Sequence, residues 1–108
     1  LVTRGDKTGP LVFCLPAHRE IDLRLAASVT GNKKLEMIHV KDLLSLTGYI
    51  RGGVSPIGMK KKFPTYIDET CILYDEIAVS AGERGHQMLI PHEAIVSIVD
   101  AKLEDLIL

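Results

Sequence analysis

The sequence has 108 residues, which is enough for one domain with a single core and too few for two. Hydrophobic residues make up 46% and charged residues 25%, an ordinary globular balance. The formal charge is −1, from 13 basic and 14 acidic residues. Such a chain cannot hold nucleic acid by bulk charge alone, so a nucleic-acid ligand would require a local basic patch or a partner protein.

The two cysteines, Cys14 and Cys71, both lie inside apolar segments. Two are too few for a disulfide scaffold, and neither stands in a metal-binding spacing, so we expect reduced, buried thiols. No apolar stretch approaches the roughly 20 residues of a membrane span, and the first residues lack the apolar run of a signal peptide. We therefore expect a cytoplasmic chain with no membrane partner.

The first third of the chain predicts a β-hairpin followed by a helix. Residues 1–3 favour a strand, residues 4–10 a turn, and the apolar run 11–15 a buried strand, because a proline bounds that run on each side. A helix is predicted over 20–29, where apolar residues recur at every fourth position. Gly31, with the asparagine after it, should end this helix.

Short strands and helices follow along the rest of the chain. The predicted helices lie at 41–46 and from Pro91 to about Val99. The predicted strands are all short, and they lie at 34–40, 63–67, 76–80 and 86–90, the last two as a hairpin. Residues 102–108 fit neither pattern clearly. Because strands dominate and helices are few, the expected class is α+β, with a curved mixed or antiparallel sheet and packed helices.

The segment 48–58 is rich in glycine, which breaks both helix and strand. Gly52 and Gly53 let the backbone approach a ligand closely, and successive free N–H groups there could hold a carbonyl oxygen or a phosphate. Ser55 adds a hydroxyl, and Pro56 stiffens the loop. On spacing alone, a structural turn in a twisted sheet is the simpler explanation. The segment is not a P-loop, because no Gly-Lys-Ser/Thr follows at the required distance.

Basic residues flank this glycine-rich segment. Arg51 precedes the glycine pair, and three adjacent lysines, Lys60, Lys61 and Lys62, follow the loop. Three adjacent lysines are commonly a solvated surface run. Their place beside a glycine-rich loop makes contact with a phosphate backbone an equal alternative.

A second glycine-containing turn separates the two strands of the hairpin predicted near the C-terminus. It contains Ser80, Ala81, Gly82, Arg84 and Gly85. A hairpin turn by itself explains the two glycines. Arg84 could also bind a phosphate or a carboxylate through two of its N–H groups.

No residue pattern indicates a metal, a cofactor or a hydrolase triad. The four histidines, His18, His39, His86 and His92, are not spaced as helical ligand pairs, and none adjoins a probable nucleophile. The GxSxG motif of serine hydrolases is absent. We therefore expect neither a metal nor a cofactor.

Four segments in chain order resemble the YbaK/EbsC family. They are Thr8–Val12, Gly31–Met37, Thr47–Gly58 and Ser80–Gly85, and together they span nearly the whole chain. The last two are similar to the two signature loops of the family. Four segments in the family's order are far more specific than a single glycine motif.

The resemblance implies a small, distorted, β-barrel-like sheet with packed helices, a fold shared with the editing domain of bacterial prolyl-tRNA synthetases. It implies an aminoacyl-tRNA deacylase that hydrolyses mischarged tRNA, with Cys-tRNA(Pro) as the expected substrate and prolyl-tRNA synthetase as an expected partner. In cysteine-specific members the thiol of the substrate itself takes part, which suits a chain without a triad.

The resemblance also implies roles for the two loops. Backbone N–H groups from Gly52 through Val54 to Ser55 would polarise the ester carbonyl, in a loop completed by Pro56. The turn 80–85 would bind the substrate. Arg51 and the lysine run 60–62 would contact the acceptor end of tRNA.

One part of the family pattern is not found in these residues. The family's lysine stands in a Lys-Thr-Leu-like stretch that would fall just ahead of Leu1, and Lys7 lies in the following turn, so it cannot replace that lysine. We expect residues 1–108 to be a single editing domain that lacks its N-terminal part, roughly 40 residues of a normal member, and to be inactive alone. The alternatives are a noncatalytic relative that binds tRNA or a partner, and a transcription-related or envelope role.

Overall fold

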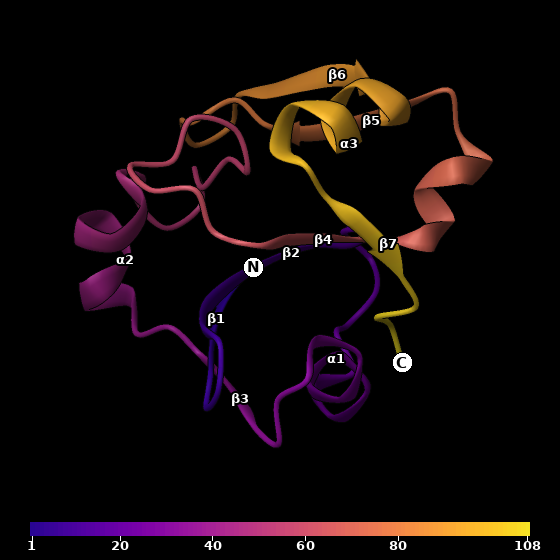
Figure 1. Cartoon of the computed structure of the whole chain (residues 1–108). Coiled ribbons are helices and arrows are strands. Elements are labelled where there is room, and N and C mark those ends of the chain that lie inside the picture. Colours follow the sequence, from indigo (N-terminus) through magenta and orange to yellow (C-terminus); the bar gives the residue numbers. More distant parts are fainter.

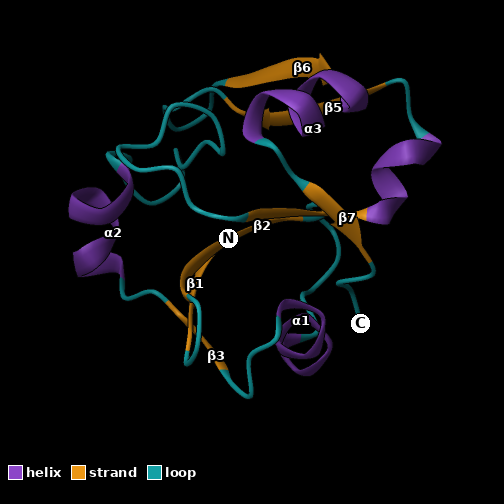
Figure 2. Cartoon of the chain, in the orientation of Figure 1, coloured by secondary structure: helices purple, strands orange, loops and turns teal.

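The computed structural model describes all 108 residues, which form a five-stranded sheet, a separate β-hairpin and helices (Figures 1 and 2). The strands are β1 (Val2–Gly5), β2 (Gly9–Cys14), β3 (Leu35–Met37), β4 (Thr65–Asp68), β5 (Glu76–Ser80), β6 (Gln87–Pro91) and β7 (Lys102–Glu104). The helices are α1 (Leu23–Thr30), α2 (Val40–Thr47), α3 (His92–Val99) and the 3-10 helix η1 (Glu69–Leu73). The predicted α+β class is confirmed.

The main sheet is mixed and open, with the strand order β3-β1-β2-β4-β7. β1 pairs antiparallel with β2 and β3, whereas the pairs β2–β4 and β4–β7 are parallel. A mixed sheet with packed helices is therefore confirmed. The barrel-like closure that the resemblance implied is not found, because the edge strands β3 and β7 do not pair and the β5–β6 hairpin pairs only with itself.

The predicted N-terminal hairpin is formed by β1 and β2, and two side chains fasten its turn to the segment after α1. Asp6 Oδ1 accepts the N–H groups of residues 33 and 34, at 2.9 and 3.1 Å. In return, Asn32 Oδ1 accepts those of residues 7 and 8, at 2.9 and 3.1 Å. The two turns thus satisfy each other's backbone donors.

Helix α1 begins three residues later than predicted. Asp22 is its N-cap, and Asp22 Oδ1 accepts the N–H groups two and three residues further on, both at 3.1 Å. Ile21, which was predicted to lie inside the helix, instead forms an isolated bridge with Ile107. The helix ends as predicted at Gly31, whose φ of 80° lies in the left-handed region.

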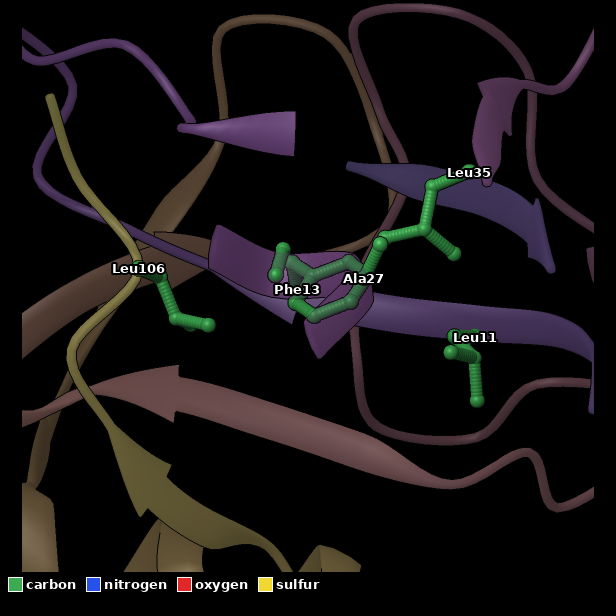
Figure 3. Close-up of a cluster of buried hydrophobic side chains, with 6 residues drawn as sticks. Leu11, Phe13, Ala27, Leu35 and Leu106 are labelled. Carbon is green, nitrogen blue, oxygen red and sulfur yellow. The ribbon is translucent and has the colours of Figure 1, made fainter. Parts of the chain in front are cut away.

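Two apolar clusters hold the fold together. The first, which packs α1 against the sheet, contains Leu11, Phe13, Ala27, Leu35 and Leu106 (Figure 3). The second contains Ile67, Cys71, Val79, Ile90, Ile95 and Val99, and so joins β4 to η1, the β5–β6 hairpin and α3. In β4, Tyr66 packs against the first cluster, and the adjacent Ile67 belongs to the second. The central strands are therefore covered on both faces, which explains the continuous apolar run in β2.

The closing segment and η1 were not resolved by the sequence pattern. β7 pairs parallel with β4, and the N–H of Leu106 donates to the buried carboxylate of Asp68 at 2.9 Å. Asp68 also caps η1, since its second oxygen accepts the N–H and the hydroxyl of Thr70 at 3.1 and 2.6 Å. A single buried carboxylate organises both segments.

The other two helices agree with their predictions to within one residue at each end. α2 covers the predicted 41–46 with one extra residue on each side, and α3 starts directly after Pro91. Each of the three α-helices has eight residues, and none has the length and apolar character needed to cross a membrane.

Candidate functional site

The glycine-rich loop starts where α2 ends. The hydroxyl of the buried Thr47 donates to the carbonyl of Leu43 at 2.8 Å and accepts the N–H of Tyr49 at 3.1 Å. Gly48, with a φ of 86°, ends the helix in the left-handed region. The chain then runs from α2 toward β4 as a long loop that folds against the turn between β5 and β6 (Figure 1).

A tight turn opens the loop and uses one of the N–H groups that we expected to be free. The N–H of Gly53 donates to the carbonyl of Ile50 at 2.9 Å, and Gly52 has a φ of 87°. Gly52 is the third residue of this four-residue turn, and a positive φ at that position is typical of turns that require glycine. The expectation of a free N–H at Gly53 is therefore wrong. The N–H groups of Gly52, Val54 and Ser55 have no acceptor within the chain, and those of Val54 and Ser55 follow each other directly as a pair of free donors.

Ser55 shapes the loop from inside. The residue is only 3% exposed, and its hydroxyl oxygen accepts the N–H of Ile57 at 3.2 Å. A hydroxyl that is buried and engaged in its own loop is poorly placed to attack a substrate. Its observed contact is structural, because it closes a hydrogen bond across Pro56 within the loop.

The two signature segments contact each other. A Cβ placed on Gly53 would lie 3.1 Å from main-chain atoms of Glu83, so any larger residue would have to push that main chain away. The Nε–H of Arg84 donates to the carbonyl of Arg51 at 2.8 Å. Within the second segment, the hydroxyl oxygen of Ser80 accepts the N–H of Gly82 at 3.3 Å.

In the second segment, the remaining predicted residues lie on the exposed side of the turn. Ala81 and Gly85 are both exposed, and the N–H of Ala81 donates to the carbonyl of His86 at 2.9 Å. Gly85 has a φ of 75° and no heavy atom close to the position of a Cβ. These two residues close the hairpin.

Tyr49 links the two segments, and the sequence analysis did not single it out. Its hydroxyl donates to the carbonyl of Ile57, across the glycine loop. A Cβ on Gly82 would lie 3.0 Å from a carbon of its ring, and one on Gly58 would lie 3.0 Å from its hydroxyl. No periodic pattern in the sequence predicts this role for a tyrosine. The sequence signal is the presence of Gly58 and Gly82, which have no side chain to fill the space that Tyr49 occupies.

Unpaired cations surround the loop. The three ion pairs of the chain join Lys34 to Glu36, His86 to Glu83 and His92 to Glu93, and none involves Arg51, Arg84 or the lysine run 60–62. The main-chain N–H of Lys60 donates to the carbonyl of Thr47 at 3.0 Å, and its alkyl stem covers Gly48. The loop is therefore a local basic patch on a chain of net charge −1.

Lys61 and Lys62 line a cavity of about 170 Å³, which we call the lysine hollow. One wall is loop residues between Pro56 and Phe63, and the other includes Ile98 and Val99 of α3. The turn 80–85 does not line this hollow. The two signature segments therefore meet by direct contact, and the cavity lies along the downstream half of the glycine loop.

Neither thiol is prepared to act as a nucleophile. Burial raises the pKa of the Cys14 thiol, and burial together with the nearby carboxylate of Asp68 raises that of Cys71. Both thiols therefore stay protonated near neutral pH, and the thiolate is the reactive form. No group of three or more His, Cys, Asp or Glu side chains is placed to hold a metal ion.

Comparison with known proteins agrees with this architecture. The family model for the aminoacyl-tRNA editing domain matches residues 1–98. A relative from Enterococcus faecalis (strain ATCC 700802 / V583), named as a candidate Cys-tRNA(Pro)/Cys-tRNA(Cys) deacylase, EbsC, is 53% identical over 106 residues. That alignment covers 98% of this chain, which spans 65% of the length of the relative.

Solved structures share the fold over the whole chain. A crystal structure described as a candidate trans-editing enzyme for prolyl-tRNA synthetase superposes with a TM-score of 0.91, at 27% identity, and 68% of that chain is covered. The hypothetical protein APE2540 superposes with a TM-score of 0.90 at 17% identity, with 71% of its chain covered, which supports the fold alone. Together with the match over residues 1–98, these results show that the chain belongs to the aminoacyl-tRNA editing domain family.

Proposed function

We propose that this chain carries the carbonyl-polarising and tRNA-contacting parts of an aminoacyl-tRNA deacylase that acts on Cys-tRNA(Pro). The observation that carries the proposal is the pair of free N–H groups at Val54 and Ser55, in a loop fixed by Arg84 and Tyr49. Support comes from the family membership and from the enterococcal relative, which is named for this activity.

The chemical step is cleavage of the ester between the amino acid and the terminal ribose. As a nucleophile adds to the carbonyl carbon, negative charge develops on the carbonyl oxygen. The N–H groups of Val54 and Ser55 are fixed donors that stabilise this charge without reorganising. For a cysteinyl ester, the new bond is C–S and the bond that breaks is C–O. The thiol proton ends on the ribose oxygen that leaves with the tRNA, and the acyl group leaves as a cyclic thioester of cysteine, which water then opens to free cysteine.

The proposed division of labour explains why residues 1–108 contain no nucleophile. The substrate's thiol supplies it, and Ser55, Cys14 and Cys71 are buried or held protonated. The resemblance assigns positioning of the aminoacyl group to a lysine that lies outside residues 1–108. We therefore assign to this chain the loop and the basic patch, and not the complete pocket.

Partner and compartment follow from the substrate. We propose proline tRNA as the nucleic acid, prolyl-tRNA synthetase as an associated protein and the cytoplasm as the compartment, since tRNA charging takes place there. The net charge of −1 supports the need for a partner. The one basic patch that we identify lies around the loop, and the rest of the chain offers a polyanion such as tRNA no comparable affinity.

The test is release of radiolabelled cysteine from Cys-tRNA(Pro). The 108-residue chain is compared with a chimaera that adds the segments of the enterococcal relative lying outside the matched region. We expect the chimaera to release cysteine and the 108-residue chain to be at least about 100-fold slower. Equal rates would show that residues 1–108 suffice for the reaction and that it needs no further lysine.

A substitution in the chimaera tests the free donors directly. Val54→Pro removes one N–H group, and we expect a rate lower by about 10²–10³-fold, whereas Val54→Ala keeps the donor and the rate. Thermal unfolding of both variants checks that the fold is retained. A chimaera that binds tRNA and releases no cysteine would instead favour a noncatalytic binding protein.

A further inference from the structure

The lysine hollow adjoins the glycine loop, yet no step of the proposed reaction uses it. Its volume of about 170 Å³ is roughly half the lower limit for pockets that hold drug-sized ligands. It can therefore take one compact group, such as an amino-acid side chain or a single nucleobase. The chemistry of its lining decides between these two.

The charge of the lining favours a phosphate over an aminoacyl group. Lys61 and Lys62 line the hollow, no acidic residue does, and neither lysine has an ion-pair partner. An aminoacyl ester carries an α-ammonium group when protonated, which two unpaired lysines would repel. A phosphodiester carries one negative charge, so both lysines would attract it, and its binding would release counterions.

The rest of the lining is suited to a flat apolar group. Phe63 and Ile57 contribute from the loop, and Ile98 contributes from α3 with a side chain that is 57% exposed. The ring of Phe63 has no aromatic partner, since the only stacked pair of rings is Phe13 and Tyr66. An unpartnered aromatic ring beside unpaired lysines is the combination on which proteins stack unpaired bases.

We propose that the lysine hollow binds one unpaired nucleotide of the tRNA 3′ end, with its base against Phe63 and Ile98 and its phosphate at Lys61 and Lys62. The identification of the RNA as tRNA rests on the proposed function, whereas the affinity for a single-stranded nucleotide rests on the hollow alone. Because Pro56 and Ile57 belong both to the glycine loop and to the hollow, a nucleotide held there contacts the residues that directly follow the two free N–H groups.

The experiment uses the 108-residue chain and a fluorescent RNA tetranucleotide ending in CCA, with binding followed by anisotropy at several salt concentrations. Phe63→Leu removes the ring and should weaken binding about 10-fold, whereas Phe63→Tyr keeps the ring and should bind as the parent does. The double substitution Lys61→Gln/Lys62→Gln should reduce the salt slope by about 0.7–1.4.

The matched control is Lys33→Gln/Lys34→Gln, which removes the same charge from two adjacent exposed lysines next to β3. It should leave the salt slope almost unchanged. An abasic tetranucleotide, which keeps the phosphates, should bind the parent and Phe63→Leu equally. The proposal is overturned if Phe63→Leu binds the intact RNA as the parent does, or if both double variants lower the slope equally.

Failure of this inference is distinguishable from failure of the proposed function. In the chimaera, Phe63→Leu should raise KM for Cys-tRNA(Pro) and leave hydrolysis of a small cysteine ester unchanged. If RNA binding depends on Phe63 but no ester is hydrolysed, the nucleotide site stands and the deacylase assignment falls. If esters are hydrolysed and RNA binding does not depend on Phe63, the deacylase assignment stands and the nucleotide site falls.

Discussion

The ring of Tyr49 lies so close to Gly82 that a Cβ at position 82 would come within 3.0 Å of a ring carbon. The same tyrosine donates its hydroxyl to the carbonyl of Ile57. One side chain therefore contacts the turn between β5 and β6 and also braces the glycine loop. The position of the two free N–H groups in that loop depends on this brace.

Tyr49→Phe should loosen the glycine loop without unfolding the chain. The substitution removes the hydroxyl that satisfies the carbonyl of Ile57, and the expected loss is about 0.5–1.5 kcal/mol in the free energy of unfolding. Tyr49→Ala also removes the packed ring and should cost roughly 2–4 kcal/mol. Urea denaturation followed by circular dichroism measures both. Equal stability of Tyr49→Phe and the parent would show that the hydroxyl does not brace the loop.

Gly82→Ala should destabilise the chain more than Gly85→Ala. Both glycines have a positive φ, at 99° and 75°, so both substitutions carry backbone strain of about 1–2 kcal/mol. Only the substitution at 82 also collides with Tyr49, because nothing lies within 4 Å of a Cβ at 85. The difference between the two melting temperatures isolates the contact with the tyrosine. If the two variants have the same melting temperature, the contact with Tyr49 does not contribute to the difference in stability.

Asn32→Ala should cost about 2–4 kcal/mol of stability. The residue is 7% exposed, and its side chain accepts the N–H groups of Lys7 and Thr8 while donating to the hydroxyls of Thr8 and Thr30. Its loss leaves the two N–H groups without partners in the chain at the junction of the hairpin turn and β3. Urea denaturation gives the value. Thr8→Val, which removes only one of the four bonds, is the control and should lose much less.

The carboxylate of Asp6 should make stability depend on pH in the acid range. Backbone hydrogen bonds, that from Lys34 first, hold the pKa of Asp6 below its ordinary value. A depressed pKa in the folded state means that the stabilisation is present above about pH 4 and is lost as the pH falls through the folded pKa.

Melting temperatures of the parent and of Asp6→Asn, measured from about pH 2 to pH 6, test this sign. The parent should be the more stable protein at pH 6, and the two curves should converge at the acid end. A constant difference across the whole range would mean that the charge of Asp6 contributes nothing.

Local patterns in the sequence identified most of the elements because they depend on neighbours along the chain. The apolar run 11–15, bounded by prolines, predicted β2, and the glycines at 31 and 48 ended α1 and α2 as expected. The start of α1 was predicted three residues too early because an aspartate suits a first helical turn as well as an N-cap. The two hydrogen bonds that Asp22 accepts show that it is the N-cap.

The tertiary structure alone decided the parallel pairing of β4 with β2 and β7, since parallel strands are joined through distant segments. It also decided which donors of the predicted run are free: the carbonyl of Ile50 takes the N–H of Gly53 and leaves those of Gly52, Val54 and Ser55. The sequence by itself determined that two glycine-bearing segments exist and that they resemble one family. That Tyr49 and Arg84 hold the two together could be decided only in three dimensions, because the partners lie 33 residues apart along the chain.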